Sequence, residues 1–350
     1  MKKHFSYSIL LLALGFAFAM GGCQQPSDIS QHQSTLPLNS ASTPANPALT
    51  FTDQTNTGTN KNPVLVDVLE VCDSSASHRT TLYTASSSSE AVTNPCWAPG
   101  GGSICFLDGT GTFGLALKAC DVSVNSNGVA VASNFRSIYA PSISDSVRLY
   151  DPRWSQNSST AQIAFIRLHY NYTQKGLFEL CVVSTSGGTV TVLSSIQDLV
   201  GNTVEKNFRY PDWSPDDSKI ALSRQDTIVT GTSVHCTIML LDASTGAALD
   251  SITPPFVSGG QANTIRWSHT GTNELAFTVM NTGIYYCAPS TGSTPTTNGV
   301  NTAFDCWSPT NSTLLIGGGS SALRKLTPFT TTTSTIASSF TDIGPIDWKH

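Results

Sequence analysis

The stretch Trp213-Ser-Pro-Asp-Asp-Ser-Lys-Ile-Ala-Leu222 is the fullest copy of a phrase that returns along the chain. A tryptophan comes first, a polar turn follows it, and a short apolar run follows the turn; the last copy contains only the start of the phrase. The sequence has six tryptophans, and all belong to such a copy: Trp97, Trp154, Trp213, Trp267, Trp307 and Trp348. The last two steps between them are 40 and 41 residues, which is the length of a four-stranded propeller blade, about 40–45 residues.

The phrase resembles the repeat of WD40-like (PD40) propellers, as found in the C-terminal domain of TolB. Weaker copies of it cover residues 92–348. The resemblance implies an all-β fold, a six-bladed β-propeller in which strand A of each blade contains the tryptophan and strands B, C and D follow outward. A tryptophan on the crowded inner strand would wedge between two sheets and bury about 200 Å².

Short alternating segments between polar turns predict the remaining strands of blades one to five. The expected B strands lie near 104–107, 162–168, 219–223, 274–279 and 314–316. The expected C strands lie near 115–122, 177–184, 237–242, 284–287 and 323–326. The expected D strands lie near 129–133, 190–193, 248–252, 293 and 332–336.

The sixth blade must take its outer strands from the N-terminal side, because Trp348 is followed by only two residues. Residues 63–71 alternate well and 80–84 follow them, so we expect these segments to pair with 341–348. Such closure removes exposed sheet edges, which otherwise recruit other chains. The alternative is a five-bladed ring with a separate C-terminal tail.

The first residues have the pattern of an export signal sequence. Two lysines precede an apolar run from Ile9 to Met20, which is too short to span a bilayer. The run ends at Met20-Gly-Gly-Cys23, which resembles a bacterial lipobox. That resemblance implies a lipid on Cys23, a cell-envelope location and, because Gln24 follows the cysteine, the outer membrane. The alternative is an ordinary secretory signal with an incidental cysteine.

Three segments follow from these patterns. Residues 1–22 are the expected lipoprotein signal peptide, 23–62 a lipidated flexible tether, and 63–350 the TolB-like propeller. The tether is rich in polar residues and proline and poor in large apolar ones, so it cannot offset its ordering entropy. A binding peptide around Leu36–Leu38 is the alternative within it.

Eight cysteines remain besides Cys23. An even number of cysteines in an exported chain favours disulfides. Spacing in the repeat gives four candidate pairs, and buried free thiols are the alternative. The pairs are Cys72–Cys96, Cys287–Cys306, Cys181–Cys236 and Cys105–Cys120. The cysteine and histidine spacings do not match a zinc motif, so no metal is expected.

Charged residues next to the tryptophans are the candidate binding residues. They are Asp151, Arg153, Asp212, Arg266, Asp305 and Asp347. We expect them to surround the mouth of the central channel, with turn capping as the alternative role of the acids. The sequence contains no nucleophile elbow, no HExxH, no P-loop and no dinucleotide-binding motif, so neither catalysis nor a cofactor is predicted.

Composition and resemblance together predict a binding module. The chain has 350 residues, a net charge of −5 and only 12% charged residues, which provides no basic surface for nucleic acid. TolB-like propellers bind proteins or peptides, so we expect a monomeric, lipid-anchored interaction module with an envelope protein or peptide as its partner. The chain lacks the N-terminal α/β domain of TolB, which leaves TolB's own partners in doubt. The alternative is a propeller that binds glycans or processes polysaccharides.

Overall fold

The computed structural model of the protein describes residues 47–349 with short gaps. The gaps are residues 60, 112, 172–174, 199–203, 229–233, 255–261, 270–272, 280–281, 291–292, 298, 300–301, 303, 317–321, 339 and 341–343. The expected signal peptide, Cys23 and the tether as far as residue 46 lie outside the described residues. Within the described part, no helix has the length and apolar character needed to cross a membrane.

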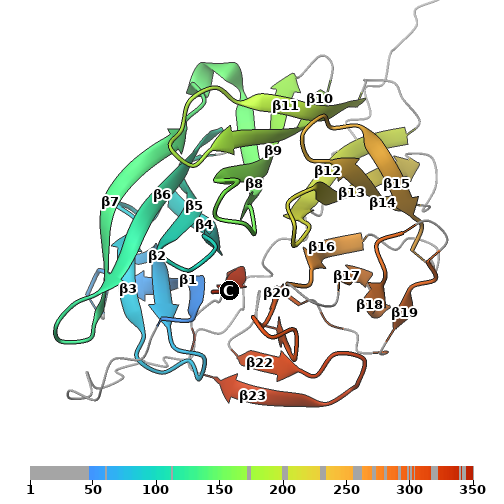
Figure 1. Cartoon of the computed structure of the whole chain (residues 1–350). Helices are drawn as coiled ribbons and strands as arrows, with labels where there is room; N and C mark the ends of the chain where they lie inside the picture. Colours follow the sequence, from blue (N-terminus) through green and yellow to red (C-terminus); the bar gives the residue numbers. More distant parts are fainter. Residues whose placement is uncertain are drawn as a thin grey trace, which may run out of the picture. The chain divides into compact units, whose positions relative to one another are not determined.

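The described strands form six four-stranded antiparallel sheets arranged around an axis, which is a six-bladed β-propeller (Figure 1). Blade one contains β4 (Glu90–Trp97), β5 (Ser103–Thr110), β6 (Gly114–Val124) and β7 (Ala130–Tyr139). Blade two contains β8 (Val147–Trp154), β9 (Gln162–Asn171), β10 (Lys175–Ser184) and β11 (Thr191–Asp198). Blade three contains β12 (Val204–Trp213), β13 (Lys219–Ile228), β14 (Val234–Asp242) and β15 (Ala248–Ile252).

The remaining blades have shorter strands. Blade four contains β16 (Ala262–Trp267), β17 (Leu275–Val279), β18 (Gly283–Cys287) and β19 (Thr296–Thr297). Blade five contains β20 (Cys306–Trp307), β21 (Leu314–Ile316), β22 (Leu323–Leu326) and β23 (Thr333–Ala337). Blade six contains β24 (Ile346–Trp348), β1 (Leu49–Asn56), β2 (Leu65–Cys72) and β3 (Thr80–Thr84). The predicted B, C and D strands are confirmed, except that β19 lies a few residues beyond the expected position 293.

Blade six is closed by strands from both ends of the described chain, as the sequence predicted. The inner strand β24 pairs with β1, in a register that places Leu49 opposite Trp348 and Phe51 opposite Ile346. The five-bladed alternative is therefore wrong. The detail of the pairing also differs, because β2, which we expected beside β24, pairs with β1 instead and lies one position further out.

The strand that sequence reasoning missed is β1, which lies inside the segment predicted as a tether. The folded part therefore starts before residue 63, and the tether prediction is wrong for residues 49–56. Strand β1 was missed because it is covered on both faces, so its polar residues are buried as well. Thr50 is fully buried and its hydroxyl donates to the Glu70 carbonyl at 3.2 Å. A strand rich in hydroxyl groups resembles a linker in composition.

Among the described residues the hydrophobic core consists of six clusters, and each cluster lies between two neighbouring blades. Each tryptophan packs against the blade that precedes its own: Trp154 joins the cluster of blades one and two, and Trp213 that of blades two and three. All six are at most 8% exposed. The prediction that the indoles wedge between sheets is confirmed.

The predicted disulfides do not form, and all eight cysteines in the described part of the chain are buried free thiols. The inter-blade clusters explain this result, because each predicted pair is divided between two of them. Cys105 packs between blades one and two, whereas Cys120 faces the other side of the same sheet, between blades six and one. The remaining three pairs are divided in the same way.

Candidate functional site: the central channel

A bulge in strand A determines which side chains face the axis. In blades one to four the register between strands A and B shifts just before the residue that precedes tryptophan. The third residue before the tryptophan has a positive φ in each case: Asn94 53°, Asp151 51°, Tyr210 55° and Thr264 50°. Bulges redirect side chains, and here the redirected residue is the one that precedes tryptophan.

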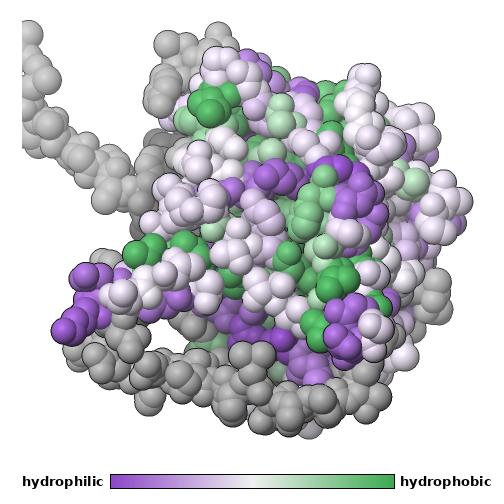
Figure 2. Space-filling view, turned by 90° about the vertical axis from the view of Figure 1, so that its left-hand side faces the viewer, coloured by the Kyte–Doolittle hydropathy of each residue, from purple (hydrophilic) through white to green (hydrophobic). Residues whose placement is uncertain are grey.

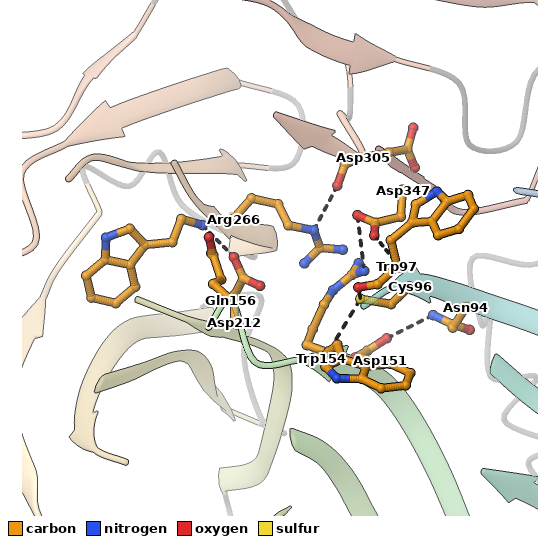
Figure 3. A network of polar contacts seen from close by, with 12 residues as sticks. Asn94, Cys96, Trp97, Asp151, Trp154, Gln156, Asp212, Arg266, Asp305 and Asp347 are labelled. Atoms are coloured by element: carbon orange, nitrogen blue, oxygen red, sulfur yellow. Dashed lines mark hydrogen bonds and ion pairs between the residues drawn. The ribbon is translucent and has the colours of Figure 1, made fainter. Parts of the chain in front are cut away.

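These residues form a ring in the central channel, which we call the channel ring. Its members are Cys96, Arg153, Asp212, Arg266, Cys306 and Asp347. Each blade contributes one member, and each member is between 3% and 8% exposed. Figure 3 shows four of these side chains, Cys96, Asp212, Arg266 and Asp347, which converge from different blades. With Arg153 and Arg266 against Asp212 and Asp347, the formal charges of the ring cancel when both carboxyls are ionised.

The channel ring ties each blade to the next through the tryptophan backbone. Asp347 of blade six accepts the Trp97 backbone N–H of blade one at 2.8 Å (Figure 3). Asp212 of blade three accepts the Trp267 backbone N–H of blade four at 2.6 Å. The thiols take the same role, because Cys96 Sγ accepts the Trp154 backbone N–H at 3.4 Å. An acceptor before one tryptophan therefore holds the backbone at the next.

The arginine side chains cannot accept a hydrogen bond, so they connect blades through other atoms. Arg266 Nε donates to the Asp305 carbonyl of blade five at 2.8 Å. Arg153 Nη1 lies 3.9 Å from Asp347 Oδ1. Burial opposes the charge of Arg153, but Cys96, Asp347 and Asp212 outweigh burial and raise its pKa. The carbonyl oxygens of both arginines accept the indole N–H of the following blade, from Trp213 at 3.1 Å and Trp307 at 3.2 Å.

Folding changes the pKa of the ring member Asp212. Burial raises its pKa to about 7, although Arg153 and the Trp267 backbone N–H act in the opposite direction. The pKa in the unfolded chain is about 3.9. A group whose pKa is raised by folding contributes stability that is fully present below its unfolded pKa and is lost as pH rises through its folded pKa. Stability should therefore fall between about pH 4 and pH 7.

We expect Asp212→Asn to flatten this pH dependence. The amide oxygen can still accept the Trp267 N–H, and the uncharged side chain has no ionisation to suppress. Urea unfolding at pH 5 and pH 8 measures the effect. Between pH 5 and pH 8 the free energy of unfolding of the intact protein should fall by on the order of 2 kcal/mol more than that of the variant. Equal pH dependence of the two proteins would show that Asp212 does not titrate in this range.

The channel itself has little room. The cavity inside the ring measures about 20 Å³, which suits a water molecule rather than a substrate. His269 Nδ1 of blade four lies 3.0 Å from Gln156 Oε1 of blade two, and both side chains line this cavity. The groups in this channel thus interact mainly with one another.

The structure places four of the six predicted mouth residues in the ring and two outside it. Asp151 receives Arg209 Nε at 3.0 Å and the Tyr210 backbone N–H at 3.1 Å, so it joins blades two and three. Asp305 contributes its backbone carbonyl, as described above. Sequence reasoning had treated Cys96 and Cys306 only as disulfide candidates. Their place directly before tryptophan, which they share with the four charged members, was the signal that could have identified them.

Larger grooves lie instead on the face of the propeller that carries the turns between strands A and B. A groove of about 230 Å³ lies between blades three and four and contains Asp216, Lys219 and Trp267. A larger groove of about 630 Å³, which we call the closing groove, lies between blades five and six. Its lining is Pro47, Ala48, Ser74, Ser308, Pro309, Thr310, Ser312, Thr313, Lys325, Trp348 and Lys349.

Elsewhere the described surface has neither a metal cluster nor a large apolar patch in view. Among the described residues, no group of three or more His, Cys, Asp or Glu side chains is placed to hold a metal ion. Figure 2 shows the side on which β7 lies, and its hydrophobic residues are separate groups among hydrophilic ones. The exposed large hydrophobic residues of blade one include Val131 and Phe135.

Comparisons with known proteins assign neither a family nor a function to this chain. No family model and no curated protein matches the sequence. Among solved structures, the Cps50 (Swd1) β-propeller domain of Myceliophteria thermophila is 11% identical, covering 86% of this chain and 93% of that chain, with a TM-score of 0.49. The GH93 α-L-arabinofuranosidase of Fusarium graminearum is 12% identical, covering 74% and 80%, with a TM-score of 0.46.

A third similar structure is a puromycin-hydrolysing peptidase of Mycobacterium tuberculosis. It is 10% identical over 79% of this chain, with a TM-score of 0.44. This chain covers only 42% of the peptidase. At such identities the likeness concerns the fold alone, so the likeness to TolB remains a prediction.

Proposed function

We propose that the protein is a lipid-anchored envelope module that binds a protein or peptide partner on the face of its A–B turns. One observation carries the proposal: the ring side chains fill the channel, whereas the grooves on the turn face are open. The channel carboxylates of Asp212 and Asp347 hold backbone N–H groups of neighbouring blades, which favours a structural role for them over general acid or base work.

Photocrosslinking in cells tests which face the partner covers. A crosslinking amino acid at Ser158, an exposed position in the A–B turn of blade two, should capture a defined partner. The matched control is Thr110, which is exposed at the opposite end of a blade-one strand. Capture at Thr110 but not at Ser158 would contradict the proposed face, and capture at neither would contradict the proposed function.

The lipid anchor is the second part of the proposal and rests on the lipobox-like sequence around Cys23. We expect the intact chain to incorporate radiolabelled palmitate and to fractionate with the outer membrane. The Cys23→Ser variant should incorporate no label, since the thiol that carries the lipid is absent. If the intact chain were found unlabelled in the soluble fraction, an ordinary secretory signal would be the better interpretation.

A further inference from the structure

The closing groove exists because blade six is assembled from two distant segments. In blade three a short turn joins strand A to strand B, and Ser214 Oγ accepts the Lys219 backbone N–H across it at 2.9 Å. In blade six the pairing of β24 with β1 has no such connecting turn. The segments meet instead through Lys349, whose backbone N–H donates to the Ala48 carbonyl at 2.7 Å. The space beside this junction is the groove of about 630 Å³, a size typical of ligand sites.

The charge of the closing groove is opposite to that of the whole chain. Two lysines, Lys325 and Lys349, line it, and the described lining residues include no Asp or Glu. Lys325 Nζ lies 5.3 Å from the centre of the Trp348 ring, and Lys349 Nζ lies 5.9 Å from the centre of the Trp97 ring of blade one. In the smaller groove between blades three and four, Lys219 has Asp216 beside it in the lining. The closing groove is therefore a positive site on a chain with net charge −5.

We propose that the closing groove binds an acidic peptide segment of the partner, an inference that rests on the proposed function. The two lysines suit carboxylate side chains, and the exposed hydroxyls of Ser74, Thr310 and Ser312 can hydrogen-bond a peptide backbone. Pro47, Ala48 and Pro309 provide apolar contact for the intervening residues. A sugar ring would need an open aromatic face, and Trp348 is only 8% exposed with a lysine over its ring.

Calorimetric titration tests this proposal with residues 1–350 freed of lipid by Cys23→Ser. The probe is a capped six-residue peptide in which Glu and Ala alternate, and the comparison peptide carries Gln in place of Glu. The Glu peptide should bind about tenfold more tightly than the Gln peptide, and this preference should shrink as salt rises. Lys325→Gln combined with Lys349→Gln should weaken its binding about tenfold, whereas the control Lys219→Gln should leave it unchanged.

Each outcome decides the proposal. Because glutamine keeps most of the lysine stem, the double variant should melt like the unsubstituted protein, and circular dichroism checks this. Absence of binding by the Glu peptide, or equal weakening by Lys219→Gln, would overturn the assignment. Tighter binding of an oligogalacturonate than of the peptide would assign the groove to acidic saccharides instead. If crosslinking at Ser158 succeeds while the peptide fails, the groove assignment alone is wrong and the interaction module stands.

Discussion

A variant that ends at Pro345 is expected to lose its cooperative unfolding transition. The deletion removes β24, and with it the buried side chains of Ile346 and Trp348. It also removes the Asp347 carboxylate that accepts the Trp97 backbone N–H, and it exposes the inner edge of β1. Loss of two large core side chains and one buried hydrogen bond costs on the order of 8 kcal/mol, which is comparable with the whole stability of a typical domain.

Thermal unfolding followed by circular dichroism at a strand wavelength measures this effect. The matched control ends at Lys349, which retains all of β24 and should melt like the intact chain. If the variant ending at Pro345 kept the transition of the control, the sixth blade would not depend on its inner strand and the closure described here would be wrong.

Arg153→Met is expected to destabilise the protein by about 3–5 kcal/mol, because it leaves buried carboxylates without their cation. Arg153 lies near Asp347 and also favours the ionised form of Asp212. The matched control is Arg136→Met. Arg136 pairs with Asp121 where both side chains are about a third exposed, at 26% and 39%, and such surface pairs contribute about 0–1 kcal/mol.

Urea unfolding of Arg153→Met and Arg136→Met compares the loss of stability at the buried channel ring with the loss at a surface ion pair. Adding Asp347→Asn to Arg153→Met should restore part of the stability, since it removes one of the unpaired charges while keeping an acceptor for the Trp97 N–H. A loss below about 1 kcal/mol for Arg153→Met would show that the ring charges do not hold the channel together.

The fold could be predicted from sequence to the extent that the tryptophans marked it. Because Trp213 and its equivalents must occupy one crowded position in every blade, their spacing gave the number of blades and the location of strand A. The alternating runs around residues 248–252 and 314–316 then gave whole strands. Strand β1 could not be predicted from hydropathy, since burial on both faces places Thr50 and Asp53 in the interior together with Leu49 and Phe51.

Four of the six members of the channel ring were predicted from the sequence, and the other two were missed for a related reason. Asp212, Asp347 and the two arginines stood out as charges, whereas Cys96 and Cys306 had an alternative explanation as disulfide partners. The register decides between these roles, because the bulge before the tryptophan in blades one to four turns the preceding residue toward the axis. The sequence repeat identifies the position before each tryptophan, and the backbone geometry determines that its side chain faces the channel. The closing groove combines β24 with residues near Pro47, so it could not be foreseen while that segment was considered a tether.

The most direct test of the closed ring is complementation between its two ends. We expect a chain of residues 63–350, which contains the whole domain as predicted from sequence but lacks β1, to be unfolded by circular dichroism and amide exchange. Addition of a synthetic peptide of residues 47–62 should restore the cooperative transition of a chain of residues 47–350, because β1 supplies the pairing between β24 and β2. A chain of residues 63–350 that folds alone with the same transition would contradict the account.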